Sequence, residues 1–153
     1  MKKYYLAYGS NLNVHQMKYR CPTARIVGTA VIRDYELLYK GSKTGSYLTI
    51  EKKEGGVVPV AVWEVTAADE HSLDIYEGYP NFYYKKNMKI RLSEAEKMID
   101  AFVYIMHEER RLGIPTSAYV STCKFGYTIF GFDFKYLDEA YEKSLKGAAH
   151  YEN

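Results

Sequence analysis

The order of the secondary-structure patterns is the feature that most limits the fold of this chain. Segments rich in β-branched and aromatic residues recur between residues 4 and 106. Helical patterns dominate only afterwards, in one segment from Pro115 to about Ile129 and in another that Asp133 caps and that ends at Gly147. This order predicts an α+β fold with a mostly antiparallel or mixed sheet, which can close into a barrel, rather than a doubly wound α/β fold.

The strand pattern divides into several segments bounded by turn residues. We predict strands over residues 4–8, 24–40, 47–52, 57–65, 82–92 and 98–106. The segment 24–40 forms one long strand or two, with an interruption near Arg33 and Asp34. A turn at Gly55 and Gly56 separates the third strand from the fourth, and a polar hairpin loop joins the last two.

Two helices are expected among these strands. Residues 14–20 have helical spacing and precede Pro22, which cannot continue a helix. Residues 67–77 follow Thr66, a favourable N-cap with Asp69 three positions later, and precede Gly78, which suits the position after a helix end. The second helix is important because its last residue is acidic.

Length and charge restrict the classes of function. The 153 residues are enough for one domain, here taken as residues 1–153, with 47% hydrophobic and 26% charged residues. A net charge of +2 is too small to indicate nucleic-acid binding. Cys21 and Cys123 lie far apart without metal or redox spacing, and no segment has the pattern of a signal peptide or a membrane span. These features predict a soluble cytoplasmic protein.

The polar segment Tyr8-Gly9-Ser10-Asn11-Leu12 follows the first predicted strand. Glycine and the short polar side chains tolerate unusual backbone angles, so successive N–H groups can converge on one point. Such a cradle binds a carboxylate or an oxyanion. Local sequence alone favours a plain turn, because Gly-Ser-Asn clusters are common in loops.

Glu77 is the best candidate for a general base. It ends the 67–77 helix, where the helix dipole disfavours a negative charge, and aromatic residues crowd the sequence around it. Both effects raise the pKa of a carboxyl group and make its anion a better base. On spacing alone, a solvated glutamate near Lys85 or Lys86 is the more frequent case, and Asp74 is a second candidate on an adjoining part of the helix surface.

Other candidate sites are weaker. Gly41-Ser42-Lys43-Thr44 lacks the glycines of a phosphate-binding loop. The four histidines have no metal-ligand spacing, and no metal or other cofactor is expected. Ser10 lacks the setting of a hydrolase nucleophile, and Cys123 is expected to be a small buried hydrophobe. The chain holds 17 tyrosines, a residue that suits pockets both apolar and wet, so Tyr119 alone is a weak signal.

The segment from Tyr5 to Leu12 resembles the signature of the γ-glutamylcyclotransferase family, which includes the AIG2-like proteins. Leu73-Asp74 followed by Glu77-Gly78 resembles the second motif of this family, and Tyr84 also fits. The region from Pro115 through Tyr119 to Tyr141 is similar to the C-terminal part of the family. The resemblance covers nearly the whole chain in order.

The resemblance implies a small mixed β-barrel with flanking helices and a cofactor-independent reaction. The free α-amine of a γ-glutamyl compound attacks its own γ-carbonyl, which releases 5-oxoproline and an amine or amino acid. Glu77 would be the catalytic base, Tyr8 and the N–H groups from Gly9 to Leu12 would bind the substrate, and Tyr84 and Tyr119 would shape the pocket.

Several alternatives stay open at this level. The family acts on γ-glutamyl amino acids, γ-glutamylamines, glutathione and protected antibiotic precursors, and the sequence does not select among these small-molecule partners. A non-catalytic binding protein on the same scaffold is the main alternative, and a structural interaction protein is a third. The sequence does not distinguish a monomer from a homodimer.

Overall fold

The computed structural model describes residues 2–42 and 45–152. The elements in chain order are β1 (Lys3–Ala7), the 3-10 helix η1 (Ser10–Leu12), α1 (Val14–Arg20), β2 (Arg25–Ser42), β3 (Gly45–Val65), α2 (Ala67–Glu77), β4 (Tyr83–Arg91), β5 (Met98–Met106), β6 (Arg111–Leu112), α3 (Ser117–Phe130) and α4 (Lys135–Glu152).

The strands form one mixed sheet in the order β4-β5-β1-β3-β2-β6. The pair β1 and β5 is parallel and the other pairs are antiparallel. A bridge between Ala30 of β2 and Leu92 after β4 brings two strands together that are not neighbours in the sheet order. The sheet is therefore curled into a half-barrel with four α-helices in the described part of the chain, and the predicted α+β fold is confirmed.

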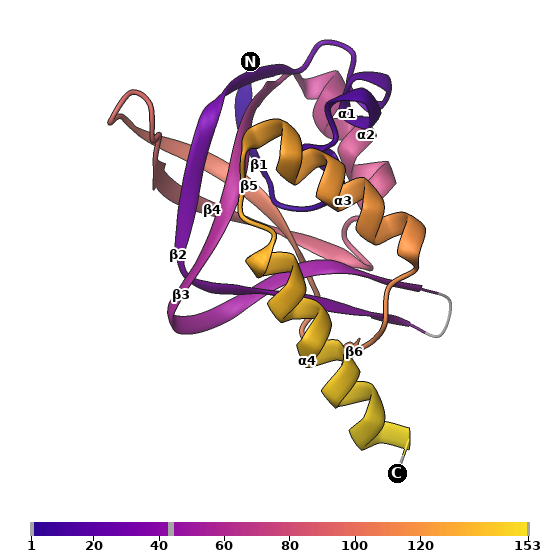
Figure 1. The fold of residues 1–153 in the computed structure, drawn as a ribbon. Helices are drawn as coiled ribbons and strands as arrows, with labels where there is room; N and C mark the ends of the chain where they lie inside the picture. Colours follow the sequence, from indigo (N-terminus) through magenta and orange to yellow (C-terminus); the bar gives the residue numbers. More distant parts are fainter. Residues whose placement is uncertain (1, 43–44, 153) are drawn as a thin grey trace.

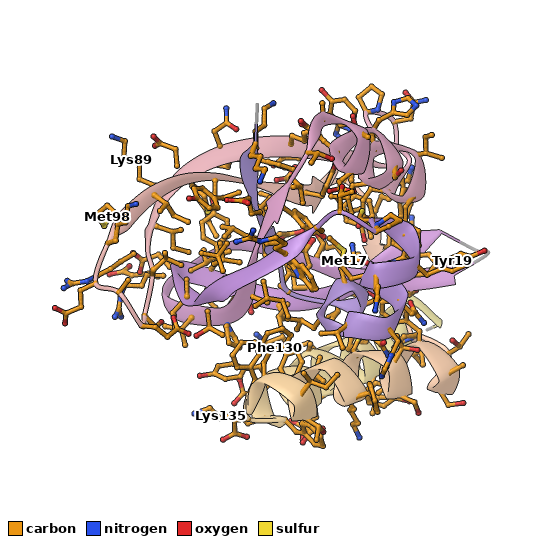
Figure 2. The ribbon with its side chains drawn as sticks, turned by 90° about the horizontal axis from the view of Figure 1, so that it is seen from above. Met17, Tyr19, Lys89, Met98, Phe130 and Lys135 are labelled. Carbon is orange, nitrogen blue, oxygen red and sulfur yellow. The ribbon has the colours of Figure 1, made fainter. Side chains whose placement is uncertain are left out.

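The helices lie at two places on this half-barrel. Figure 1 shows α1 and α2 side by side at the top, and α3 and α4 in front of the sheet. Seen from above in Figure 2, Met17 of α1 lies inward and Tyr19 lies at the outer edge, where it is 92% exposed. Phe130 of α3 packs against the hydrophobic core, which fills the space between the sheet and the helices. No helix in the described part is long and apolar enough to cross a bilayer.

The strands β2 and β3 form one long hairpin with a bulge in the middle. The register passes from Arg33 opposite Val57 to Tyr35 opposite Lys52, so the expected interruption near Arg33 and Asp34 is confirmed. The expected separation of 47–52 from 57–65 is wrong, because both belong to β3 and Gly55 marks this bulge rather than a chain reversal. Asp34 supports the bulge by accepting a hydrogen bond from the Gly55 N–H at 3.0 Å.

The helix predictions are confirmed except at one end. A capping box formed by Thr66 and Asp69 starts α2, and Gly78 ends it in the left-handed conformation. The expected end of the last helix at Gly147 is wrong, because α4 continues to Glu152. A Cβ atom at Gly147 would lie 2.8 Å from Leu112 Cδ1, so this glycine permits close packing of α4 on β6 and does not end the helix.

Candidate functional site

The loop after β1 is positioned by the centre of the sheet. Because β1 lies between β5 and β3, its C-terminal end delivers Tyr8 and Gly9 into the half-barrel. The chain then forms η1, in which the Leu12 N–H donates to the Gly9 carbonyl and the Asn13 N–H to the Ser10 carbonyl, both at 3.0 Å. The Leu12 N–H is therefore used within the turn. The N–H groups of Ser10 and Asn11 lie at the start of η1, where no preceding helical turn supplies a carbonyl acceptor.

A cavity of about 480 Å³ opens at this loop. It lies between β1, β3, β4, β5, the end of α2 and the start of α3. Its lining is mostly aromatic, and Glu77 is the acidic residue within it. The lining residues are Tyr5, Tyr8, Gly9, Ser10, Asn11, Tyr47, Leu48, Ile75, Tyr76, Glu77, Gly78, Phe82, Tyr83, Tyr104 and Tyr119.

The carboxyl group of Glu77 is held at the end of α2. Gly78 adopts φ 64°, which lets the chain turn away immediately after Glu77 and leaves this side chain at the cavity. Glu77 is half-buried in the wall of the cavity. Burial raises the pKa of Glu77 to about 8, and the nearby positive charge of Arg20 opposes the rise. The carboxyl group can therefore exchange a proton near neutral pH.

Arg20 joins α1 to the loop and to α2. Its guanidinium carbon lies 3.4 Å from the centroid of the Tyr76 ring, and its Nη1 donates a hydrogen bond to Asn11 Oδ1. The Tyr76 hydroxyl in turn shares a hydrogen bond of 3.0 Å with Ser10 Oγ. These contacts hold the residue before Glu77 against the loop, so the loop and the acidic helix end form one unit.

Three tyrosines of the lining donate their hydroxyl protons to the protein itself. The Tyr8 hydroxyl donates to the Tyr104 carbonyl at 2.7 Å, and the Tyr83 hydroxyl donates to the Leu48 carbonyl at 2.8 Å. The Tyr104 hydroxyl donates to Asp74 Oδ1 at 2.6 Å. These bonds fix the walls of the cavity and satisfy hydroxyl groups that burial would otherwise leave without partners.

The structure brings most of the predicted site residues together. Tyr8, Gly9, Ser10, Asn11, Glu77 and Tyr119 all line this cavity. The Tyr119 hydroxyl accepts a hydrogen bond from the Leu48 N–H at 3.0 Å, which places it beside the loop. The side chain of Leu12 is fully buried and does not line the cavity, because it packs below α3, where a Cβ atom at Gly126 would lie 2.5 Å from Leu12 Cβ.

Tyr84 does not line the cavity, and its expected place in the pocket is wrong. Its hydroxyl donates to Glu108 Oε2 at 2.5 Å on the other face of β4. Successive side chains of a strand point to opposite faces, so Tyr83 faces the cavity and Tyr84 faces away from it. The resemblance indicated Tyr84, whereas Tyr83 is the residue of this pair that lines the cavity.

Asp74, the second candidate base, also lies outside the cavity. Its Oδ1 atom is 2.9 Å from Lys85 Nζ and accepts the hydrogen bond from Tyr104. Glu70 binds the same lysine at 2.7 Å. Asp74 therefore supports the Tyr104 wall from behind, and Glu77 is the carboxyl group that faces the cavity.

Several residues of this site were missed by the sequence reasoning. Tyr5, Tyr47, Tyr76, Phe82, Tyr83 and Tyr104 line the cavity, and Arg20 supports it. Strand alternation from Tyr84 could have indicated Tyr83. The local partner of Arg20, Gln16 of the same helix, does not indicate the cavity, and the contacts of Arg20 with the loop and with α2 have no local signal.

The described residues contain no group of three or more His, Cys, Asp or Glu side chains that could hold a metal ion. The rejected phosphate-loop segment includes residues 43 and 44, which lie outside the described residues, and its remaining residues belong to the β2–β3 hairpin. The lining of the cavity supplies one carboxyl group, several hydroxyl groups and the loop amides.

Comparisons with known proteins agree with this arrangement. The family model described as "Gamma-glutamyl cyclotransferase, AIG2-like" matches residues 5–121, which include the loop, Glu77 and Tyr119. No curated protein matches the sequence. A solved structure of a gamma-glutamyl cyclotransferase is 26% identical, with a TM-score of 0.81, and the match covers 92% of this chain and 86% of that protein.

Two further solved structures show the same fold. A human protein described as uncharacterized is 26% identical with a TM-score of 0.80, over 91% of this chain and 86% of that one. YkqA of Bacillus subtilis has a TM-score of 0.74 at 15% identity, over 94% of this chain and 54% of YkqA.

Proposed function

Because the chain belongs to the AIG2-like gamma-glutamyl cyclotransferase family, we propose that it converts a γ-glutamyl compound into 5-oxoproline and a free amine or amino acid. One observation carries the proposal: Glu77, with a pKa raised to about 8, lines the same cavity as the loop from Tyr8 to Asn11. A carboxyl group with such a pKa can both accept and return a proton near neutral pH. The reaction needs both transfers.

The first half of the reaction exposes the nucleophile. The α-ammonium group of a bound substrate brings a positive charge beside Glu77, which favours the ionised carboxylate. Glu77 then takes one proton from the ammonium group, and the nitrogen lone pair forms a bond to the γ-carbonyl carbon. The π electrons of the carbonyl move to its oxygen, which becomes an oxyanion in a five-membered ring.

The second half releases the products. The oxyanion collapses to a carbonyl, the bond to the departing nitrogen breaks, and the protonated Glu77 gives its proton to that nitrogen. The ring nitrogen loses its remaining excess proton to solvent, and Glu77 is again ionised, as it was before it took the first proton. Because the nucleophile and the carbonyl belong to one molecule, a cavity that holds the chain folded gains much of the advantage of proximity.

The loop supplies polar contacts for the rest of the substrate. The N–H groups of Ser10 and Asn11 at the start of η1 are suited to bind the substrate α-carboxylate. Tyr119 lies against Gly9 and would limit the width of the cavity at this point. The aromatic walls exclude water and so strengthen each of these electrostatic contacts.

The decisive experiment measures 5-oxoproline released from a panel of γ-glutamyl amino acids and γ-glutamylamines. Glu77→Gln keeps the shape of the side chain but removes the base, so we expect its rate to fall by about 10²–10⁴-fold. Glu139→Gln, an exposed change on α4, is the matched control and should leave the rate unchanged. Equal release by the wild type and Glu77→Gln would contradict the role of Glu77. Saturable binding with all ligand recovered intact would instead indicate a binding protein.

A further inference from the structure

The hydroxyl group of Tyr5 differs from those of Tyr8, Tyr83 and Tyr104 in the same cavity. The protons of Tyr8, Tyr83 and Tyr104 are donated to acceptors of the protein, as described above. The Tyr119 hydroxyl accepts a hydrogen bond from the Leu48 N–H and lies beside Gly9. Within residues 2–42 and 45–152, the hydrogen bond recorded for the Tyr5 hydroxyl is one that it accepts, from Asn11 Nδ2 at 2.9 Å.

The direction of that hydrogen bond is fixed from outside the cavity. A guanidinium group only donates, so Arg20 Nη1 selects the oxygen of the Asn11 side chain as its partner. The amide nitrogen of Asn11 must then face Tyr5, and as a donor it occupies a lone pair of the Tyr5 oxygen. The Tyr5 hydroxyl proton consequently points away from Asn11. Asn11 is 2% exposed, so water does not compete for either contact.

The Tyr5 proton remains on the phenol and is not taken by Glu77. Burial, together with the nearby Glu77, raises the pKa of Tyr5 well above its ordinary value, so the group stays a donor at working pH. Burial and Arg20 account for the shifted pKa of Glu77, and no hydrogen bond from Tyr5 to that carboxylate is recorded in the described part of the chain. Tyr5 therefore offers a hydroxyl donor to whatever occupies the cavity.

We propose that Tyr5 is a further catalytic residue, which donates a hydrogen bond to the γ-carbonyl oxygen of the substrate, with Asn11 and Arg20 as its positioning residues. This inference rests on the function proposed above. As the α-amine bonds to the γ-carbon, the carbonyl π electrons move to oxygen, and the Tyr5 O–H group stabilises the negative charge without giving up its proton. When the oxyanion collapses and the C–N bond to the departing amine breaks, the hydrogen bond weakens again.

The first test removes one oxygen atom. Tyr5→Phe should lower kcat for 5-oxoproline release by about 10²–10³-fold, with KM within about threefold, because the bond strengthens only as the oxyanion forms. Tyr4→Phe removes the same atom from the neighbouring residue of β1, which does not line the cavity, and should leave both constants unchanged. A kcat for Tyr5→Phe within threefold of the wild type would overturn the proposal.

The second test reverses the direction of the hydrogen bond between Asn11 and the Tyr5 hydroxyl. Asn11→Asp replaces the donating amide by a carboxylate, which only accepts, so the Tyr5 proton should turn towards it while the contact with Arg20 is kept. We expect this variant to lose about as much kcat as Tyr5→Phe, and the double variant to lose little more. A merely structural role of Asn11 would give additive losses, and that result would overturn the assignment of Asn11 and Arg20.

A binding measurement separates this inference from the proposed function. If the wild type releases no 5-oxoproline from any substrate, the proposed function fails, and calorimetry with 5-oxoproline itself becomes the readout. Its ring carbonyl is the former γ-carbonyl, so Tyr5→Phe should weaken its binding by about 3–10-fold, whereas Tyr4→Phe should not. Equal affinity of wild type and Tyr5→Phe, or no binding by either, would overturn the role of Tyr5.

Discussion

The guanidinium group of Arg20 stacks on the ring of Tyr76, 3.4 Å from its centroid, directly before Glu77 in the chain. This contact holds a positive charge from α1 near a carboxyl group at the end of α2. Burial raises the pKa of Glu77 and Arg20 lowers it, and the balance places it at about 8. The proton affinity of the site is thus set jointly by two helices that meet only in the folded protein.

Removal of the Arg20 charge should make Glu77 harder to ionise. In Arg20→Gln we expect the pKa of Glu77 to rise above its wild-type value, because burial then acts without an opposing cation. The titration can be followed by NMR of the ¹³C-labelled glutamate carboxyl groups, with Glu77→Gln used to assign the signal. Lys18→Gln removes an equal charge from the exposed face of α1 and should leave the pKa of Glu77 unchanged. The same shift in both variants would show that Arg20 has no special effect.

The pKa of Glu77 also predicts how the stability of the protein depends on pH. From about pH 4.5 to pH 8, the unfolded chain loses the Glu77 proton while the folded protein retains it. The folded state binds more protons in this window, so its free energy of unfolding falls as pH rises, by up to about 1.4 kcal/mol per pH unit from this group. The contribution is fully present below pH 4.5 and is lost above pH 8.

Glu77→Gln should remove this part of the pH dependence. We therefore expect the melting temperature of the wild type to fall relative to that of Glu77→Gln as the pH rises from 5 to 8. Calorimetry in matched buffers measures this difference. Glu139→Gln, with its exposed side chain, should follow the wild type at each pH. A constant difference between Glu77→Gln and the wild type would show that the Glu77 pKa is not raised in the folded protein.

Gly78 should matter for activity as well as for stability. It has φ 64°, and Gly131 at the end of α3 has a similar φ of 71°. Alanine at either position should cost about 1 kcal/mol of unfolding free energy, because side chains disfavour this conformation. Only Gly78→Ala should also lower kcat/KM, since it adjoins Glu77 and its Cβ atom would lie 3.2 Å from Phe82 Cβ. Equal kcat/KM for the two variants would contradict this expectation.

Gly126 determines how closely α3 approaches the loop. A Cβ atom there would lie 2.5 Å from Leu12 Cβ and 2.8 Å from the Asn13 nitrogen, so Gly126→Ala must displace α3 or the loop. We expect a loss of about 1–3 kcal/mol of unfolding free energy and a higher KM for the γ-glutamyl substrate. Denaturant titration and initial rates test this prediction, with Ser121→Ala on the exposed face of α3 as the control. If Gly126→Ala were as stable as the wild type, the packing of α3 on Leu12 would not be close enough to exclude a methyl group.

The elements of the fold were largely predictable because local rules govern them. The Thr66 and Asp69 cap and Gly78 defined α2 from sequence alone, and the apolar run of β5 was found at its observed bounds. The errors occurred where tertiary contacts override local signals. Gly147 looks like a helix end but serves the packing of α4 on Leu112, and Gly55 marks a bulge within one strand.

The candidate site was predictable only in part. The loop and Glu77 were candidates from the residues alone, and the resemblance to a known family favoured them over a plain turn and a solvated glutamate. The side of β4 that faces the cavity was assigned wrongly. Tyr84 resembles a pocket residue, yet Tyr83 is the one whose side chain reaches the cavity. Arg20 could not be found at all, since the contacts that join it to the site are made with Asn11 of the loop and Tyr76 of α2.

The sequence by itself determined which residue types are available and where helices and strands begin, because caps, turns and periodicity act over a few residues. Only the tertiary structure decided that burial raises the pKa of Glu77, that Arg20 opposes this rise, and that Asn11 directs the Tyr5 proton away from itself. Burial and hydrogen-bond direction depend on atoms brought together from distant parts of the chain, and no local pattern encodes them.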